Sequence, residues 1–318
     1  MRLSARLPNF FVVGAPKTGT TSLYSYLKQH PQIFMSPVKE PSFLADEMRP
    51  GNFSEPYEPR IRRTRDRLRQ HLREGSDGAP PPGLVTDWED YERLFQNVRD
   101  ESAVGEASVT YLWSPTAARN IHARFPQAKI IMILRDPVER AYSEHVQHLD
   151  DGPSRATFRE EIDRCVRGGG QALSTSYPFL EFGLYHSQVK RYLEIFPREQ
   201  IRICWYEAWR EPRRLLAELF EFLNVRVDFQ ADIRLKSRER RAFRVAGLGY
   251  ALKKLRLWEP MAGVVPRAVR RALRRVAFRS GKALVMDPKD REYLIGYYRE
   301  DVQKLAALLN RDLTGWLQ

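Results

Sequence analysis

An eight-residue loop, Gly14-Ala15-Pro16-Lys17-Thr18-Gly19-Thr20-Thr21, follows a short apolar run and precedes a helical pattern. Strand, glycine loop and helix in this order form an anion site, because backbone N–H groups and the helix N-terminus point at the anion. The two glycines have the spacing of a nucleotide-binding P-loop, G-x-x-x-x-G-K-[ST]. Here Thr20 stands where that loop has its lysine, and the lysine is Lys17, inside the loop. A lysine at the crest of the loop lies over a bond that breaks in a transfer reaction.

A second set of candidate ligands follows the apolar run at residues 129–134. Arg135 comes directly after this predicted strand, at the edge where α/β sheets bind ligands, and its guanidinium can hold a phosphate through two N–H groups. Ser143 lies eight residues later, about two turns into a predicted helix, and can donate to the same phosphate. Asp136 precedes Pro137 and is interpreted as a helix cap, and Arg140 as a structural ion-pair partner.

The two motifs together resemble those of sulfotransferases that use 3′-phosphoadenosine 5′-phosphosulfate (PAPS). The chain is also similar to bacterial members related to heparan-type glycan sulfotransferases, at His30-Pro31 and in the segments 39–43, 105–108, 182–185 and 287–309. The resemblance implies PAPS as co-substrate, PAP as product, no metal, and an acceptor hydroxyl on a glycan, lipid or small molecule. It implies phosphosulfate contacts from the loop and 3′-phosphate contacts from the strand-end motif, and so assigns these cofactor residues: Pro16, Lys17, Thr18, Gly19, Thr20, Thr21, Arg135 and Ser143.

Sulfuryl transfer needs a base for the acceptor proton and a cation at the leaving oxygen. Lys17 suits the second role. Glu40 is the first candidate for the base, since related glycan sulfotransferases carry their catalytic glutamate at the matching position of a Glu-x-x-Phe pattern. His145 and His148, which share a helix face, are the alternative bases. Lys39 and Glu106 are candidate substrate-binding residues; Glu106 is equally well explained as a buried partner of a basic residue.

The resemblance has two gaps. Glycan sulfotransferases often carry a lysine after the glutamate of the Glu106 segment, and here the residue is Ala107. They also carry a Lys-Gly-Arg cofactor loop near the C-terminus, which neither Lys236-Ser237-Arg238 nor Ser280-Gly281-Lys282 matches well. The first gap leaves a glycan acceptor in question, and the second leaves the C-terminal cofactor contacts unassigned.

Strands that alternate with helices must position these residues. Short apolar runs at 10–14, 33–35, 103–106, 129–134 and 201–205 predict strands, and helical patterns separate them. The prediction is a three-layer α/β, P-loop-like fold with a central, mainly parallel sheet flanked by helices. We expect one sulfotransferase domain over residues 1–318, with an insertion or mobile acceptor-side loops at 44–100 and a basic helical segment at 234–282.

The charge of the chain favours anionic partners. The formal net charge is +13, and residues 234–282 hold 16 lysines and arginines against two acids. This segment predicts contact with an anionic acceptor or an anionic membrane surface. The alternative interpretation is purely structural: a helix that packs on the domain and exposes a solvated basic face. Nucleic acid is not expected as a partner, because the chain has no recognisable nucleic-acid module.

The two cysteines, Cys165 and Cys204, form no zinc pattern, and Cys204 lies in an apolar run typical of a buried thiol. No apolar stretch is long enough to span a membrane, and the N-terminus lacks the apolar core of a signal peptide. We therefore expect a cytoplasmic protein, with peripheral membrane contact through the basic segment as an extension.

Two other functions remain open at this point. A nucleotide-dependent kinase with a variant P-loop would need magnesium and a lysine at position 20. A non-catalytic PAP-binding protein at a membrane surface would use the basic segment and would not need Glu40.

Overall fold

A five-stranded parallel sheet forms the centre of the computed structural model, which describes residues 7–54, 57–75, 78–151, 156–168, 178–234, 241–243, 278–280 and 285–318. The strand order is β2-β3-β1-β4-β5, so β1 lies in the middle between β3 and β4. All four pairings are parallel, which confirms the predicted sheet. The strands are β1 (Phe10–Gly14), β2 (Ile33–Met35), β3 (Ala103–Ala107), β4 (Lys129–Leu134) and β5 (Ile201–Trp205).

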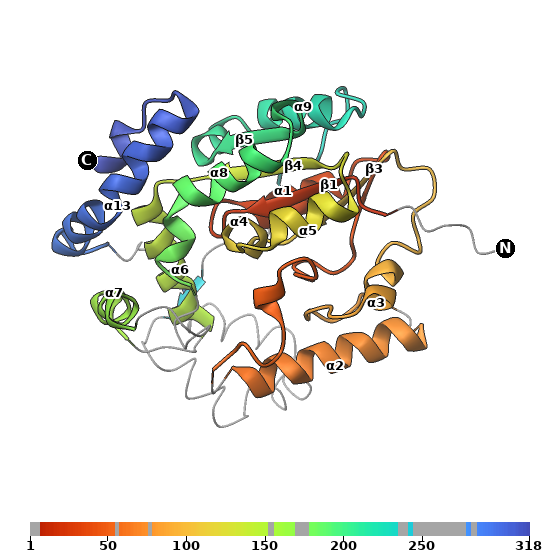
Figure 1. The fold of residues 1–318 in the computed structure, drawn as a ribbon, viewed down its shortest axis with the longest axis horizontal. Coiled ribbons are helices and arrows are strands. Elements are labelled where there is room, and N and C mark those ends of the chain that lie inside the picture. The colour runs from red at the N-terminus through yellow and green to blue at the C-terminus, as the bar shows by residue number, and fades with distance from the viewer. Residues whose placement is uncertain are drawn as a thin grey trace.

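Helices cover both faces of this sheet (Figure 1). Successive strand side chains point to opposite faces. Phe11 and Val13 therefore pack in one core cluster with α4, α5, α6, α8 and α13, while Phe10 and Val12 pack in a second cluster with α1 and α9. This confirms the three-layer α/β prediction. The helices are α1 (Thr20–Leu27), α2 (Glu58–Glu74), α3 (Trp88–Arg93), α4 (Thr110–Trp113), α5 (Ala117–Arg124), α6 (Pro137–Asp151), α7 (Phe158–Arg167), α8 (Tyr185–Ile195), α9 (Pro212–Leu223) and α13 (Pro288–Leu309), with 3-10 helices at η1 (Asp46–Met48), η2 (Glu181–Gly183), η3 (Arg198–Gln200), η4 (Tyr206–Arg210) and η5 (Thr314–Leu317).

The region between β2 and β3 is more ordered than its composition predicted. Residues 58–74 form α2, although the polar, arginine-rich sequence of residues 49–83 led us to expect a mobile loop. Leu68 and Leu72, one helical turn apart, are buried, and Arg73 donates to the buried carboxylate of Asp90 at 2.8 Å. An irregular loop is therefore wrong for residues 58–74, because two leucines on one face anchor a helix whose other faces are charged, while the alternative of an insertion at 44–100 stays a prediction.

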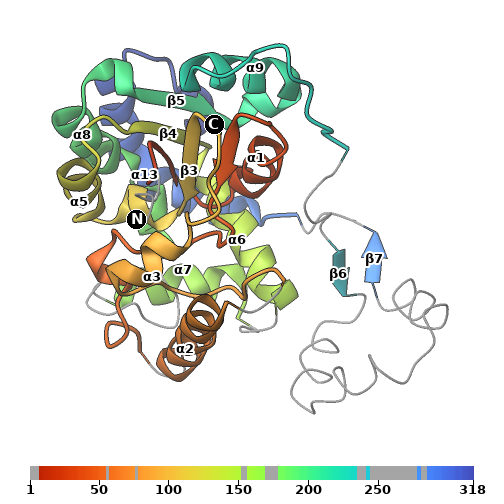
Figure 2. The same ribbon diagram turned by 90° about the vertical axis from the view of Figure 1, so that its right-hand side faces the viewer.

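The basic segment is described only in part. Arg241–Phe243 and Phe278–Ser280 form the antiparallel strands β6 and β7, apart from the five-stranded sheet (Figure 2). The predicted helical segment 234–282 is therefore wrong at residues 241–243 and 278–280, which are strands. The remainder of the predicted helical segment 234–282, from residue 244 to 277 and at 235–240 and 281–282, lies outside the described residues.

The last helix, α13, spans Pro288–Leu309, within the segment 287–309 that resembles bacterial sulfotransferases. Its buried residues include Leu294, Tyr298 and Leu305, and it packs on α8 and α6. No helix within the described ranges is both long enough and apolar enough to cross a membrane.

Candidate functional site

The loop after β1 has the shape of an anion cradle. Lys17 and Gly19 have left-handed backbone conformations, with φ angles of 65° and 89°. The Thr18 hydroxyl donates to Ala15 O at 2.7 Å, and the indole of Trp209 donates to Thr18 O at 2.8 Å. Helix α1 begins at Thr20, so the N–H groups of its first turn have no partner within the helix. The left-handed backbone of the loop and the start of α1 thus leave backbone N–H donors available for an anion above the loop.

Lys17 is bonded at two points, to α6 and to the residue that follows β4. Its Nζ donates to Gln147 Oε1 at 2.5 Å, and its carbonyl oxygen accepts from Arg135 Nη1 at 3.2 Å. The Gly14–Thr21 loop and the end of β4 are thus joined directly, although 118 residues separate Lys17 from Arg135.

Ser143 lies on α6, and the two residues that contact Lys17 stand on either side of it in the sequence: Arg135 before the helix and Gln147 within it. Arg135 also donates to Glu139 at 3.4 Å, and positions 139, 143 and 147 follow each other at four-residue intervals on α6, which places them on one helix face. Arg135 and Gln147 both contact Lys17, so along the chain Ser143 lies between two residues that touch the loop. Arg135 is only 9% exposed, and its guanidinium stacks 4.3 Å from the centre of the Tyr206 ring.

Asp136 and Arg140, which lie close to Arg135 in the sequence, have structural roles, as predicted. Asp136 accepts from the N–H of Val138 at 2.8 Å and so caps α6. Burial raises the pKa of Asp136, although the hydrogen bonds from the N–H groups of Val138 and Glu139 act in the opposite direction. Arg140 is fully buried and forms an ion pair with Glu144, which explains it as a core residue.

Glu40 lies on the turn after β2, beside the end of β3. Its N–H donates to Ala107 O at 2.8 Å, and its side chain is 42% exposed. The ammonium of Lys39 pairs with the Glu40 carboxylate. Glu40 and Ser42 have φ angles of 64° and 52°, a left-handed conformation that is costly for residues other than glycine.

Glu106, the candidate substrate-binding residue at the end of β3, lies inside the protein with 0% exposure. The hydroxyls of Ser108, Tyr91 and Tyr111 donate to its carboxylate at 2.6, 2.7 and 3.0 Å. Burial raises its pKa to about 7, against the lowering effect of these three bonds. A carboxylate enclosed in this way reaches a substrate only through the groups that it holds.

The two histidines lie where α6 meets α7. His145 is 5% exposed, and its Nδ1 lies 2.8 Å from the Glu161 carboxylate; Nδ1 of His148 lies 3.6 Å from the other oxygen. Burial opposes ionisation of Glu161, but the bonds to both imidazoles lower its pKa to about 2. Burial lowers the pKa of His148, but the hydrogen bond to Glu161 raises it by more, so that the net shift is upward. The structure thus places His145 in a packed, hydrogen-bonded position between helices.

Three residues at the site were missed by sequence reasoning. Gln147 continues the four-residue series of Ser143, and Tyr206 and Trp209 follow the carboxyl end of β5. The rule that ligands bind beyond the carboxyl ends of parallel strands would have indicated both aromatics.

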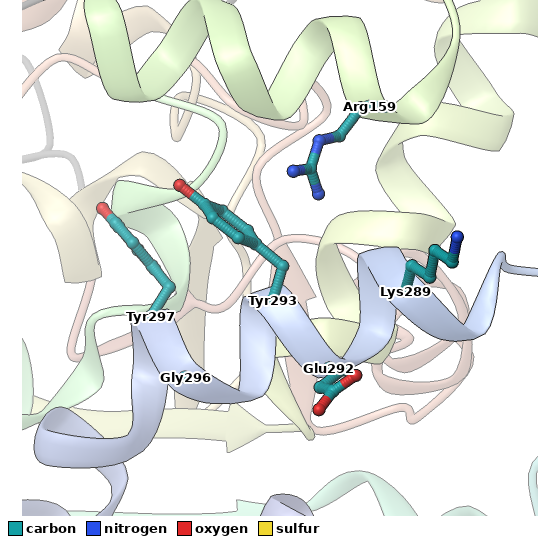
Figure 3. A pocket seen from close by; sticks show the side chains of 6 residues that line it. All are labelled: Arg159, Lys289, Glu292, Tyr293, Gly296 and Tyr297. Carbon is teal, nitrogen blue, oxygen red and sulfur yellow. The ribbon is translucent and has the colours of Figure 1, made fainter.

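A cavity of about 580 Å³ lies elsewhere, between α7 and α13 (Figure 3). Its lining includes Arg159, Tyr293 and Tyr297, and none of the residues predicted for the transfer site. Arg159 pairs with Asp163 and Asp290, so its charge is balanced. We therefore take the strand ends, and not this cavity, as the candidate site.

Comparison with known proteins agrees with this geometry. The model of the Sulfotransferase family matches residues 8–229. A crystal structure of a sulfotransferase from Alicyclobacillus acidocaldarius is similar over 98% of this chain and 99% of its own, with 31% identity and a TM-score of 0.71.

Curated relatives include carbohydrate sulfotransferase 15 of Mus musculus, 26% identical over 69% of this chain and 44% of its own length. They also include the bifunctional heparan sulfate N-deacetylase/N-sulfotransferase 3 of Homo sapiens, 28% identical over 98% of this chain and 31% of its own. The chain thus spans less than half the length of these relatives.

Proposed function

Since this chain belongs to the sulfotransferase family, we propose that it catalyses sulfuryl transfer and that its donor is PAPS, bound at the carboxyl ends of the strands. The observation that carries the proposal is the double attachment of Lys17, to Arg135 through its carbonyl and to Gln147 through its ammonium. This joins a cradle for the phosphosulfate to a guanidinium for the 3′-phosphate. In the proposal, residues 16–21 hold the phosphosulfate, and Arg135 and Ser143 hold the 3′-phosphate.

The reaction is an in-line displacement at sulfur. The acceptor oxygen forms a bond to sulfur as the bond from sulfur to the phosphate oxygen breaks, and PAP leaves with the added negative charge. Lys17 stabilises this charge on the leaving oxygen. Glu40 takes the proton of the acceptor hydroxyl, for which its carboxylate must turn from Lys39 to the acceptor.

Family membership does not favour the two other functions. A kinase would need a lysine at position 20, which is a threonine, and a binding protein without activity would not need the exposed carboxylate of Glu40. His145 remains the second candidate for the base, and its position on Glu161 is less favourable because the imidazole is enclosed.

For the acceptor we propose a hydroxylated glycan that carries negative charge. The names of the relatives support a carbohydrate. Exposed arginines on α2 at positions 60, 63 and 67 support the charge, because they recur at intervals of three and four residues on one helix face. Helix α2 lies close to the turn of Glu40: Gly83 packs on Thr64 of α2, and Val85 donates to Pro41 O at 2.9 Å.

Calorimetric titration with PAP and with ATP–magnesium tests the donor. We expect PAP to bind and ATP–magnesium to bind far more weakly. Arg135→Ala should weaken PAP binding about 10- to 100-fold, because a charged hydrogen-bond donor is lost. Arg213→Ala, an exposed arginine on α9, is the matched control and should leave PAP binding unchanged. A preference for ATP would overturn the proposed donor.

Transfer of ³⁵S from labelled PAPS to a panel of acceptors tests the rest. The panel holds desulfated heparin, chondroitin, lipid alcohols and phenols. We expect transfer to a glycan, and Glu40→Gln should lower kcat about 100-fold or more with PAP affinity retained. Normal kcat in Glu40→Gln would remove Glu40 as the base.

A further inference from the structure

The turn that carries Glu40 is held by its backbone. Three N–H groups of residues 40–44 donate across to the segment after β3: Glu40 to Ala107 O at 2.8 Å, Ser42 to Ser108 Oγ at 3.1 Å, and Leu44 to Tyr111 Oη at 3.1 Å. The left-handed residues Glu40 and Ser42 alternate with ordinary ones in this turn. Such a backbone persists only where its surroundings hold it in place.

Two of these three acceptors depend on one carboxylate. Ser108 Oγ and Tyr111 Oη accept from the turn and also donate to Glu106, at 2.6 and 3.0 Å. A hydroxyl has a single proton. When that proton points at Glu106, the oxygen lone pairs are left to face the N–H groups of Ser42 and Leu44. Glu106 therefore sets the direction of both hydroxyls.

The network offers an internal control. Tyr91 donates to the same Glu106 oxygen as Tyr111, at 2.7 Å, and is equally buried, but within the described part of the chain its hydroxyl makes no hydrogen bond to the turn. Loss of the Tyr91 hydroxyl removes a comparable bond to Glu106 and leaves the two bonds to the turn in place.

We propose that Glu106 is a positioning residue for sulfuryl transfer, which acts through Ser108 and Tyr111 to hold the turn that presents Glu40 to the acceptor. The inference rests on the proposed role of Glu40 as the base. It assigns Glu106 no contact with the substrate, since its carboxylate is enclosed and its hydrogen-bond partners among the described residues are the hydroxyls of Tyr91, Ser108 and Tyr111.

The first test compares Glu106→Gln, Ser108→Ala and Tyr111→Phe with Tyr91→Phe, in ³⁵S transfer to the best glycan of the panel and in PAP titration. We expect kcat to fall about 10- to 100-fold in the first three, because a small displacement of a catalytic group has this effect. PAP affinity should stay within about threefold, since Arg135 and the loop are untouched. Tyr91→Phe should keep kcat within about threefold. Equal losses in Tyr91→Phe and Tyr111→Phe would reduce Glu106 to a purely structural role and overturn the proposal.

A double-substitution cycle with Glu40→Gln separates the two proposals. If Glu106 acts through Glu40, then adding Glu106→Gln to Glu40→Gln lowers kcat no further. Multiplied losses would overturn the positioning role and leave the base assignment standing. Full turnover in Glu40→Gln would overturn both.

Hydrogen exchange of the turn gives a readout that needs no acceptor. In Ser108→Ala and Tyr111→Phe, peptides that cover residues 40–44 should exchange faster than in the unaltered chain, because Ser42 and Leu44 each lose an acceptor. Tyr91→Phe should leave this exchange unchanged. Unaltered exchange in all three variants would contradict the proposed path from Glu106 to the turn.

Discussion

The donor half and the acceptor half of this site are built in different ways. In the proposed donor half, the Gly14–Thr21 loop joins one strand to one helix, so a short stretch of sequence forms the proposed anion cradle. In the acceptor half, the Glu40 turn is held by residues 66 to 67 positions away, through hydroxyls that the sequence marks with no motif. A local backbone cradle is readable from spacing alone, whereas a network between distant segments is visible only after folding.

The largest expected effect lies in the donor half. Lys17→Ala should lower kcat about 100- to 1000-fold, because the charge that develops on the leaving oxygen loses its preorganised cation. Lys28→Ala, an exposed lysine at the end of α1, is the control and should retain kcat. Single-turnover transfer from labelled PAPS measures both. A loss below tenfold in Lys17→Ala would place the essential cation outside the loop and break the comparison.

In the acceptor half, the buried carboxylate of Glu106 predicts a pH effect on stability. Burial raises the pKa of Glu106 to about 7 in the folded chain, from the ordinary glutamate value of 4.5. Between these pH values the folded chain holds a proton that the unfolded chain has released. The stability that protonation of Glu106 contributes to the folded chain is therefore complete below pH 4.5. It is lost as the pH rises through 7, which lowers the free energy of unfolding by up to about 3 kcal/mol.

Glu106→Gln removes this dependence because glutamine does not titrate. The difference in free energy of unfolding, variant minus unaltered chain, should rise between pH 5 and pH 8 in urea titrations. Glu199→Gln, an exposed glutamate, should show no such rise. If Glu106→Gln is at least as stable as the unaltered chain at pH 8 and still has a low kcat there, unfolding does not explain the loss of kcat. A flat difference would mean that Glu106 ionises as readily in the folded chain as in the unfolded one.

The two halves explain what the sequence could and could not predict. The parallel sheet followed from the apolar runs, and so did the position of Arg135 at the end of a strand. The hydrogen bond from Arg135 to Lys17 did not follow from them. The enclosure of Glu106 did not follow, since it needs Tyr91 from the region between β2 and β3 and Tyr111 from α4. The same limit applies to α2, whose two buried leucines were hidden among arginines.

A moderate effect is expected at the second glycine of the loop. Gly19 has a φ of 89°, and a Cβ there would lie 2.5 Å from Trp209 Nε1. Gly19→Ala should lower the free energy of unfolding by about 1–2 kcal/mol or more and weaken PAP binding, because the left-handed backbone is costly for alanine. Thermal unfolding and PAP titration measure both effects. Gly315→Ala, where a Cβ would meet open space, is the control. Equal behaviour of the two variants would contradict the loop geometry.

The smallest effect separates two arginines that share Glu139 as a partner. Arg135 lies at the end of β4 with Lys17, whereas Arg291 reaches in from α13 and pairs with Glu139 at 3.1 Å and Asp136 at 3.6 Å. Arg291 is partly exposed, and pairs of this kind contribute about 0–1 kcal/mol. Arg291→Ala should therefore keep PAP affinity within about threefold, where Arg135→Ala loses far more. Equal losses would mean that α13 is part of the donor half, and that the phosphate site extends beyond the strand-end motif.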